Sequence, residues 1–153
     1  MSQKSLLLSE IGALRILQDS RVPLGSIDEV VPVKVPAPST VADADTILTV
    51  DVFKTGVLVQ TPTTGRTITL PTAANLAAFL KRVGDSVDIT VINLGADTVH
   101  ITLAAGTGGS IVGSAVVRDS SLTTNSDTGS AVFKVRQTNV TSGAEAYVCY
   151  RVC

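Results

Sequence analysis

The chain contains no tryptophan, and its 153 residues include only three phenylalanines and two tyrosines. Sugar rings usually stack on aromatic side chains, so this shortage weakens a carbohydrate-binding interpretation. Only 16% of the residues are charged, below the usual quarter of a globular protein. The formal net charge of −1 offers no basic surface for neutralising phosphates, which argues against a nucleic-acid partner.

Long apolar runs are also missing. No stretch approaches the roughly 20 apolar residues of a membrane-spanning helix. The run Leu6–Leu8 stops at Ser9 and Glu10, too early for the apolar region of a signal peptide. We therefore expect no membrane partner, and a protein that is made and at least initially kept in a cytosol.

The two cysteines, Cys149 and Cys153, both lie at the end of the chain. On a strand, residues four apart are separated by about 13 Å, whereas a disulfide needs Cα atoms within about 7 Å. Without further Cys or His nearby, the pair is also a poor zinc site. We expect reduced thiols, no metal and no cofactor.

Residues suited to catalysis are scarce. The only histidine, His100, falls on the polar side of its expected strand, so we expect an exposed or interface residue. The glycine-rich segment 106–113 lacks the Lys-Ser/Thr pair of a phosphate loop and leads into a strand, which predicts a tight turn.

The acidic residues Asp43, Asp45 and Asp51 lack the further converging oxygens of a calcium loop. No Ser-His-Asp order or nucleophile elbow is present. We predict that the protein is not an enzyme. An activity lost on changing His100 or Asp88 is what would revive the catalytic alternative.

Apolar residues are abundant and mostly aliphatic. They make up 44% of the chain, enough to fill a core, and Val, Ile and Thr favour β-structure. The low charge content and the mean hydropathy of +0.39 indicate that some apolar surface is covered by partners. We expect the protein to pack against copies of itself.

The N-terminal part, residues 1–45, differs from the rest. Its apolar residues are Leu7, Ile11, Leu14, Leu17, Val30, Val31, Val33 and Val35. The first four recur at helical spacing and predict a short amphipathic helix within residues 1–20. The valines lie among four prolines, which exclude a helix and a central strand. We expect an extended arm that binds a partner through these eight residues; a flexible linker is the alternative.

Residues 46–153 show the two-residue alternation of strands almost throughout. The expected strands are 47–53, 56–60, 67–70, 87–91, 99–103, 111–117, 131–135 and 146–152. Turn signals at 61–65 and 93–97 predict two hairpins, of which the second is the clearer. A helix is predicted over 73–83, between the N-cap Thr72 and Gly84.

About eight short strands over some 110 residues predict an all-β domain at 46–153. We expect a jelly-roll-like antiparallel β-sandwich with one short helix and an extended N-terminal arm. The pattern does not separate a jelly roll from an immunoglobulin-like topology, but the helix favours the jelly roll. No internal repeat is visible, which argues against propeller and solenoid folds.

Several turn and strand phrases resemble a module of tailed-bacteriophage structural proteins, particularly capsid decoration (cement) proteins and head-fibre-like proteins. These phrases lie at 58–63, 70–74, 83–97, 101–110 and 133–141. The similarity covers roughly residues 56–152 and leaves the N-terminal arm unmatched. The motifs carry no catalytic signature.

This resemblance implies a virion structural protein that is made in the host cytoplasm and located on the capsid exterior. It implies a β-sandwich that forms a homotrimer and clamps neighbouring capsomers of the major capsid protein. The N-terminal arm would then drape over the capsid protein or the adjacent protomer.

Two other roles stay open from the sequence. A head-fibre or tail-spike component would bind host surface glycan through loop residues such as 93–97 and 118–128. A cellular adhesin or surface-layer module is a further alternative, which the missing export signal counts against.

Overall fold

The computed structural model describes residues 36–96, 98–119 and 129–153. They all belong to the compact unit Val35–Cys153. The described residues form ten strands and two helices, so the expectation of a mainly-β domain is confirmed. Neither helix is long and apolar enough to cross a membrane.

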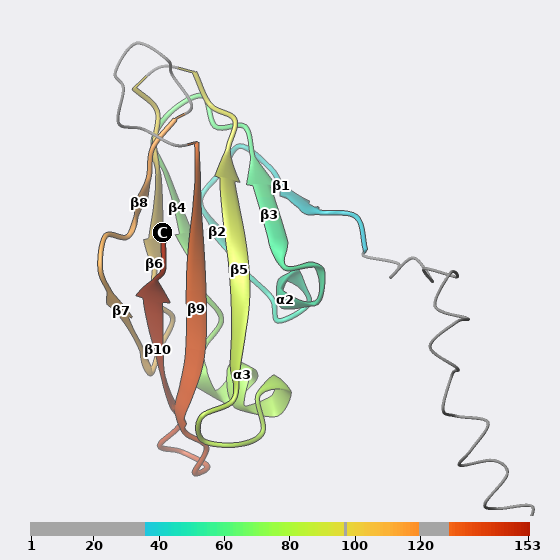
Figure 1. Ribbon diagram of the computed structural model, residues 1–153, viewed down its shortest axis with the longest axis vertical. Helices are drawn as coiled ribbons and strands as arrows, with labels where there is room; N and C mark the ends of the chain where they lie inside the picture. The colour runs from blue at the N-terminus through green and yellow to red at the C-terminus, as the bar shows by residue number, and fades with distance from the viewer. Residues whose placement is uncertain (1–35, 97, 120–128) are drawn as a thin grey trace, which may run out of the picture. The chain divides into compact units, whose positions relative to one another are not determined.

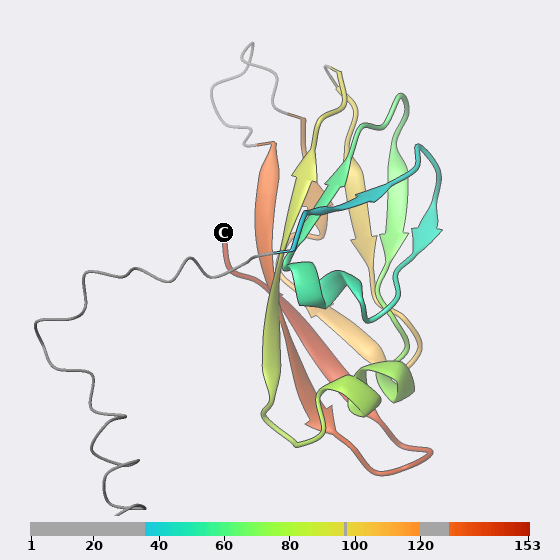
Figure 2. The ribbon, with the colours of Figure 1, turned by 90° about the vertical axis from the view of Figure 1, so that its right-hand side faces the viewer.

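The strands form two sheets, which face each other in Figure 2. One sheet contains β1 (Ser39–Val41), β3 (Val57–Gln60), β5 (Ser86–Asn93), β9 (Ser130–Asn139), β10 (Ala146–Arg151) and β7 (Gly109–Val112), in that order (Figure 1). The other contains β2 (Thr46–Ile47), β4 (Arg66–Thr69), β6 (Ile101–Ala104) and β8 (Val116–Val117), also in that order.

From β1 to β9, each successive strand lies in the opposite sheet. The pairs β1–β2, β3–β4 and β5–β6 therefore form three stacked coils, in which β1, β3 and β5 are parallel, as are β2, β4 and β6. Only β9 and β10 follow each other within one sheet, as an antiparallel pair. The coils differ in length, which explains why the sequence shows no repeat.

The pairing is mixed rather than wholly antiparallel, since five of the eight strand pairs are parallel. The jelly-roll connection order stays an unconfirmed part of the prediction. Both predicted hairpins are wrong, because β3 and β4 lie in different sheets, and so do β5 and β6. Alternation identifies which side chains face a core, but it does not identify the neighbouring strand.

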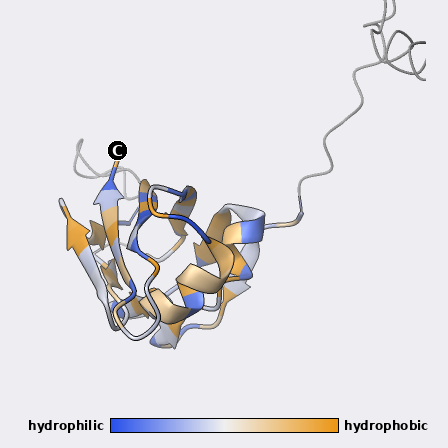
Figure 3. Cartoon of the chain, turned by 90° about the horizontal axis from the view of Figure 1, so that it is seen from below, coloured by the Kyte–Doolittle hydropathy of each residue, from blue (hydrophilic) through white to orange (hydrophobic). Residues whose placement is uncertain are grey.

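Side chains from both sheets fill a single core. Its fully buried members include Leu58 and Ile89 from one sheet and Ile68 and Ile101 from the other, with Phe133 at the centre of β9. Hydrophobic and hydrophilic residues alternate along the strands (Figure 3). This alternation confirms the predicted inward faces of β5 and β9.

The expected strand 47–53 is wrong beyond Ile47. The chain instead forms α2 (Val52–Thr55), a single turn that ends at Gly56 in the left-handed conformation, with φ of 69°. Val52 and Phe53 are buried, and the Phe53 ring stacks on Phe79 at 6.4 Å between centroids. Packing against the core therefore overrides the β-propensity of this segment.

The predicted helix 73–83 is present but shorter, because α3 spans Ala73–Phe79. Its N-cap is Thr72, as predicted, and the Thr72 hydroxyl accepts a hydrogen bond from the Asn75 amide. Leu80 is already extended, with φ of −98° and ψ of 90°, and its side chain is buried. Val83, the last residue of the predicted apolar stripe, is 60% exposed.

The expected strand 111–117 is divided between the two sheets. Gly113 adopts a φ of 94°, which a residue with a side chain rarely adopts, and breaks the strand. The residues before it belong to β7 in the larger sheet, and those after it reach β8 in the smaller one.

Candidate interaction surfaces

The predicted binding residues of the arm lie outside the described residues. These are Leu7, Ile11, Leu14, Leu17, Val30, Val31, Val33 and Val35. The described chain enters the domain at Pro36, just before β1, the edge strand of the six-stranded sheet. Residues 39–45, which the sequence analysis placed in the arm, thus contribute a strand and a turn to the sandwich.

The glycine-rich segment packs around a tyrosine. A Cβ atom on Gly109 would lie 2.1 Å from Cζ of Tyr147, and the Gly106 amide donates a hydrogen bond of 2.8 Å to the Tyr147 hydroxyl. The Thr107 carbonyl accepts a hydrogen bond from Ala73 at the start of α3. The predicted turn is confirmed, and the contact with Tyr147 explains the glycine at position 109.

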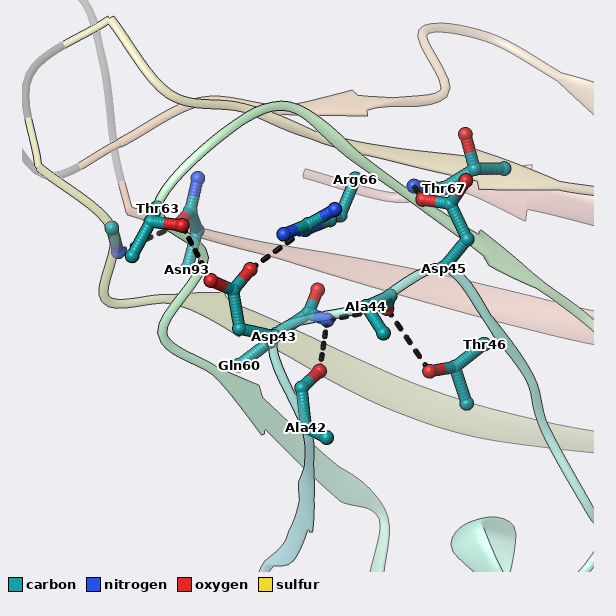
Figure 4. Close-up of polar contacts among 11 residues, drawn as sticks. Ala42, Asp43, Ala44, Asp45, Thr46, Gln60, Thr63, Arg66, Thr67 and Asn93 are labelled. Carbon is teal, nitrogen blue, oxygen red and sulfur yellow. Dashed lines mark hydrogen bonds and ion pairs between the residues drawn. The ribbon is translucent and has the colours of Figure 1, made fainter.

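A polar cluster fastens the first crossover turn (Figure 4). The Asp43 carboxylate accepts hydrogen bonds from Thr63 at 2.5 Å and from Nε of Arg66 at 2.6 Å. These contacts, the Arg66 bond above all, lower the pKa of Asp43 from 3.8 to about 2. Asp45 accepts a hydrogen bond from the Thr67 amide. Both carboxylates therefore have protein partners that hold the turn in place.

Buried amide side chains hold two of the crossovers from inside. Nε2 of Gln60 donates to the carbonyls of Ala42 and Ala44, at 2.7 and 3.0 Å. Nδ2 of Asn93 donates to the carbonyls of Val99 and Val117, at 3.0 and 3.2 Å. Gln60 and Asn93 are register partners at the ends of β3 and β5. Their positions serve the fold rather than a ligand.

The other residues singled out in the sequence lie apart from one another. His100 is exposed, Cys149 is buried and Cys153 is exposed. Burial raises the pKa of the Cys149 thiol to about 12, which makes it a poor nucleophile. Within the part of the chain that is described, no three His, Cys, Asp or Glu side chains are close enough to hold a metal ion.

The outer face of the smaller sheet, the four-strand face, carries no charged side chain within its strands. The alternation of its strands directs six side chains outward: Ile47, Thr67, Thr69, Thr102, Ala104 and Val116. Ile47 is 74% exposed at the edge, and the other five are half-buried. Three threonines make this face polar as well as uncharged.

The outer face of the larger sheet, the six-strand face, combines apolar, hydroxyl and charged side chains. Its apolar residues are Val57, Val59, Ile92, Val112, Val132, Val148, Tyr150 and Val152. Its charged residues are Asp88, Lys134 and Arg136, and Nζ of Lys134 lies 2.6 Å from the Asp88 carboxylate. Val112 and Val152 are 51% and 57% exposed. A face this apolar is typical of a surface that contacts another protein.

Comparison with known proteins adds no relative: no family model, curated protein or solved structure matches this chain. The candidate interaction surfaces are therefore inferred from the strand register and the exposure of the outward side chains alone. The sequence analysis missed the six-strand face as a site, although the alternation in residues 87–91 and 131–135 was the signal. The prediction concerned the inward residues of these segments, whereas the face is formed by their outward residues, such as Val132 and Lys134.

Proposed function

We propose that this chain is a virion structural protein of a tailed bacteriophage, a capsid decoration (cement) protein. In this proposal three copies assemble on the outside of the shell, and their N-terminal arms join neighbouring capsomers of the major capsid protein. The protein is made in the host cytoplasm and acts on the capsid exterior. Its sandwich is the jelly-roll-like module that the sequence resemblance implies.

The observation that carries the proposal is the six-strand face. Val57, Val59 and Ile92 point away from the core on adjacent strands, where a monomer in water would be expected to present polar residues. Such a surface supports a role in assembly rather than in chemistry.

The proposed mechanism is mechanical. Each copy adds modest contacts between capsomers, and the contacts of many copies must break together before internal pressure can split the shell. An interface of about 1,600 Å² is enough for one stable contact. The apolar residues of the arm, together with the sandwich, would supply that area.

The test compares the full chain with residues 36–153 for binding to purified shells of the same virus. Truncation before Pro36 keeps β1, the Asp43–Arg66 contact and the described core, whereas truncation at residue 45 removes the first two. We expect the full chain to sediment with shells and the shorter chain to stay folded but unbound, by circular dichroism and sedimentation.

Two results would contradict the proposal. Equal shell binding by the truncated chain would remove the arm from the mechanism. A full chain that ignores shells but binds host cells or their glycans would instead support the head-fibre or tail-spike alternative.

A further inference from the structure

We propose that the six-strand face packs against the same face of neighbouring copies, with the central strands running along the assembly axis. This inference rests on the proposed function in one respect, the assembly of several copies. It adds the surface through which the copies meet.

The strand register sorts the outward residues of this face into levels. One level contains Val57, Thr90 and Val132, which are consecutive register partners on β3, β5 and β9. Val152 joins it, because its amide donates to the Val132 carbonyl. The next level contains Asp88, Lys134 and Tyr150 on β5, β9 and β10, followed by Val112 on β7.

Each level is divided between two halves of the sheet. The half made by β1, β3 and β5 contributes Val57 to the first level and Asp88 to the second. The half made by β9, β10 and β7 contributes Val132 to the first level and Lys134 to the second. At each level, the two halves therefore carry side chains that attract each other.

A rotation axis parallel to the strands brings one half of a copy against the opposite half of the next copy, at the same height. With the axis between β5 and β9, strands at equal distances from it meet. Asp88 on β5 then lies opposite Lys134 on β9 of the neighbouring copy, and Val57 on β3 lies opposite Val152 at the end of β10. Around a three-fold axis each half of the face contacts a different neighbour, so the face is complementary to itself in the proposed trimer.

Charge is the reason to choose a second copy rather than an unrelated protein. The face carries an acidic and a basic side chain side by side on β5 and β9, 42% and 55% exposed at Lys134 and Asp88. An ion pair that is open to solvent can exchange partners with an equivalent pair on another copy. The four-strand face has no charged strand residue facing outward, so it lacks this means of fixing a register.

The size of the face is compatible with this role. Strands about 4.8 Å apart, rising about 3.3 Å per residue, give six strands of these lengths an area on the order of 500 Å². A standard interface buries about 800 Å² per partner, so the face supplies a large part of one.

The experiment uses disulfide cross-linking of the full chain in a Cys153→Ser background. Val57→Cys and Val152→Cys are combined in one chain. Residues 57 and 152 lie three strands apart, about 14 Å, which is too far for a disulfide within one copy. We expect oxidation to give covalent trimers on a non-reducing gel, because each copy links to both neighbours.

The matched control pair lies on the four-strand face. Thr67 and Val116 are two strands apart, with Thr102 between them. Thr67→Cys with Val116→Cys should give no cross-linked species. Cross-linking at this pair in place of the 57–152 pair would overturn the proposal.

A second measurement covers the case in which the thiols fail to align. Ile92→Lys places a charge within the six-strand face of the full chain and should reduce the molar mass in light scattering from three copies to one. Thr102→Lys on the four-strand face is the control and should not. An oligomer that survives Ile92→Lys, or a wild-type chain that is a monomer, overturns the proposal.

Neither measurement involves a shell, so the two proposals can fail separately. A chain that cross-links through residues 57 and 152 but binds no shell keeps the interface and loses the decoration role. A chain that binds shells as a monomer keeps the role and loses the interface.

Discussion

Gly109 shows how a single residue can be required by a partner far away in the chain. The sequence predicts a turn at this segment, and the turn is there, but the reason for a glycine at this position lies in β10. Tyr147 is 1% exposed and occupies the space that a side chain at position 109 would need. The burial of this one aromatic ring therefore requires the glycine at position 109.

Gly109→Ala is expected to destabilise the domain by about 1–3 kcal/mol, because the added methyl group forces the Tyr147 ring out of its site. Gly65→Ala is the matched control, since its Cβ would lie at an ordinary 3.7 Å from the nearest atoms of His100. Urea denaturation measures both variants. Equal midpoints for the two would show that the ring moves freely.

Among the elements, the helix α3 separates what local signals can predict from what they cannot. The N-cap Thr72 is a local feature and was placed correctly. The end of the helix depends on a tertiary contact, because Leu80 turns into the core. A local hydrogen bond from the Arg82 amide to the Asp85 carboxylate then stabilises the turn that follows. The apolar residues at helical spacing continue to Val83, so the sequence alone predicts a longer helix.

Shortening an apolar side chain to alanine should therefore change the stability by different amounts at the two ends of this predicted helical stripe. Leu76→Ala removes a fully buried side chain and is expected to cost about 2–5 kcal/mol. Val83→Ala, at a residue that is 60% exposed, should change the stability by no more than about 0.5 kcal/mol. Thermal or urea unfolding compares them, and a large effect of Val83→Ala would place that residue in a contact outside the described sandwich.

Strand partners were harder to predict than strands. The segments 87–91 and 99–103 are both strands or nearly so, yet they lie in different sheets. A five-residue turn can either reverse a chain within a sheet or cross the roughly 10 Å between two sheets. Asn93 stabilises the crossing between sheets here, because its buried side-chain amide donates hydrogen bonds to the carbonyls of Val99 and Val117.

For the whole molecule, the coil β1–β2 is the part that depends most on polar contacts. Among the described strands, β1 pairs only with β3, and β2 pairs with β4 over two residues. The turn between them is held by Asp43, whose side chain is 31% exposed, and by the amide of Gln60. In the proposed function this coil would link the arm to the sandwich, so its stability would matter for shell binding.

Asp43 should make the stability of the domain depend on acid pH. Its pKa is about 2 in the folded state against an ordinary 3.8, so the unfolded chain takes up this proton first as the pH falls. The stabilisation is complete above about pH 4 and is lost as the pH falls toward 2. Asp43→Asn should therefore have a lower thermal midpoint than the wild type at pH 7. Near pH 2 the two midpoints should become equal.

The control for that experiment is Asp51→Asn. Asp51 also forms an ion pair, with Lys54, but its side chain is 69% exposed and its partner lies within the same helical turn. Its midpoint should follow the wild type at both pH values. A deficit of Asp43→Asn that persists unchanged at pH 2 would show that the Asp43 charge is not what holds the turn.

Composition and alternation were sufficient to predict a mainly-β domain, its inward faces on β5 and β9, and the start of its helix. These features depend on contacts within a few residues along the chain, where the sequence records them directly. The pairing of β3 with β5, the crossing of the chain between sheets and the two levels of the six-strand face depend on residues far apart in sequence. Packing of both sheets on one core selects these partners, and a two-residue alternation is the same whichever partner is selected.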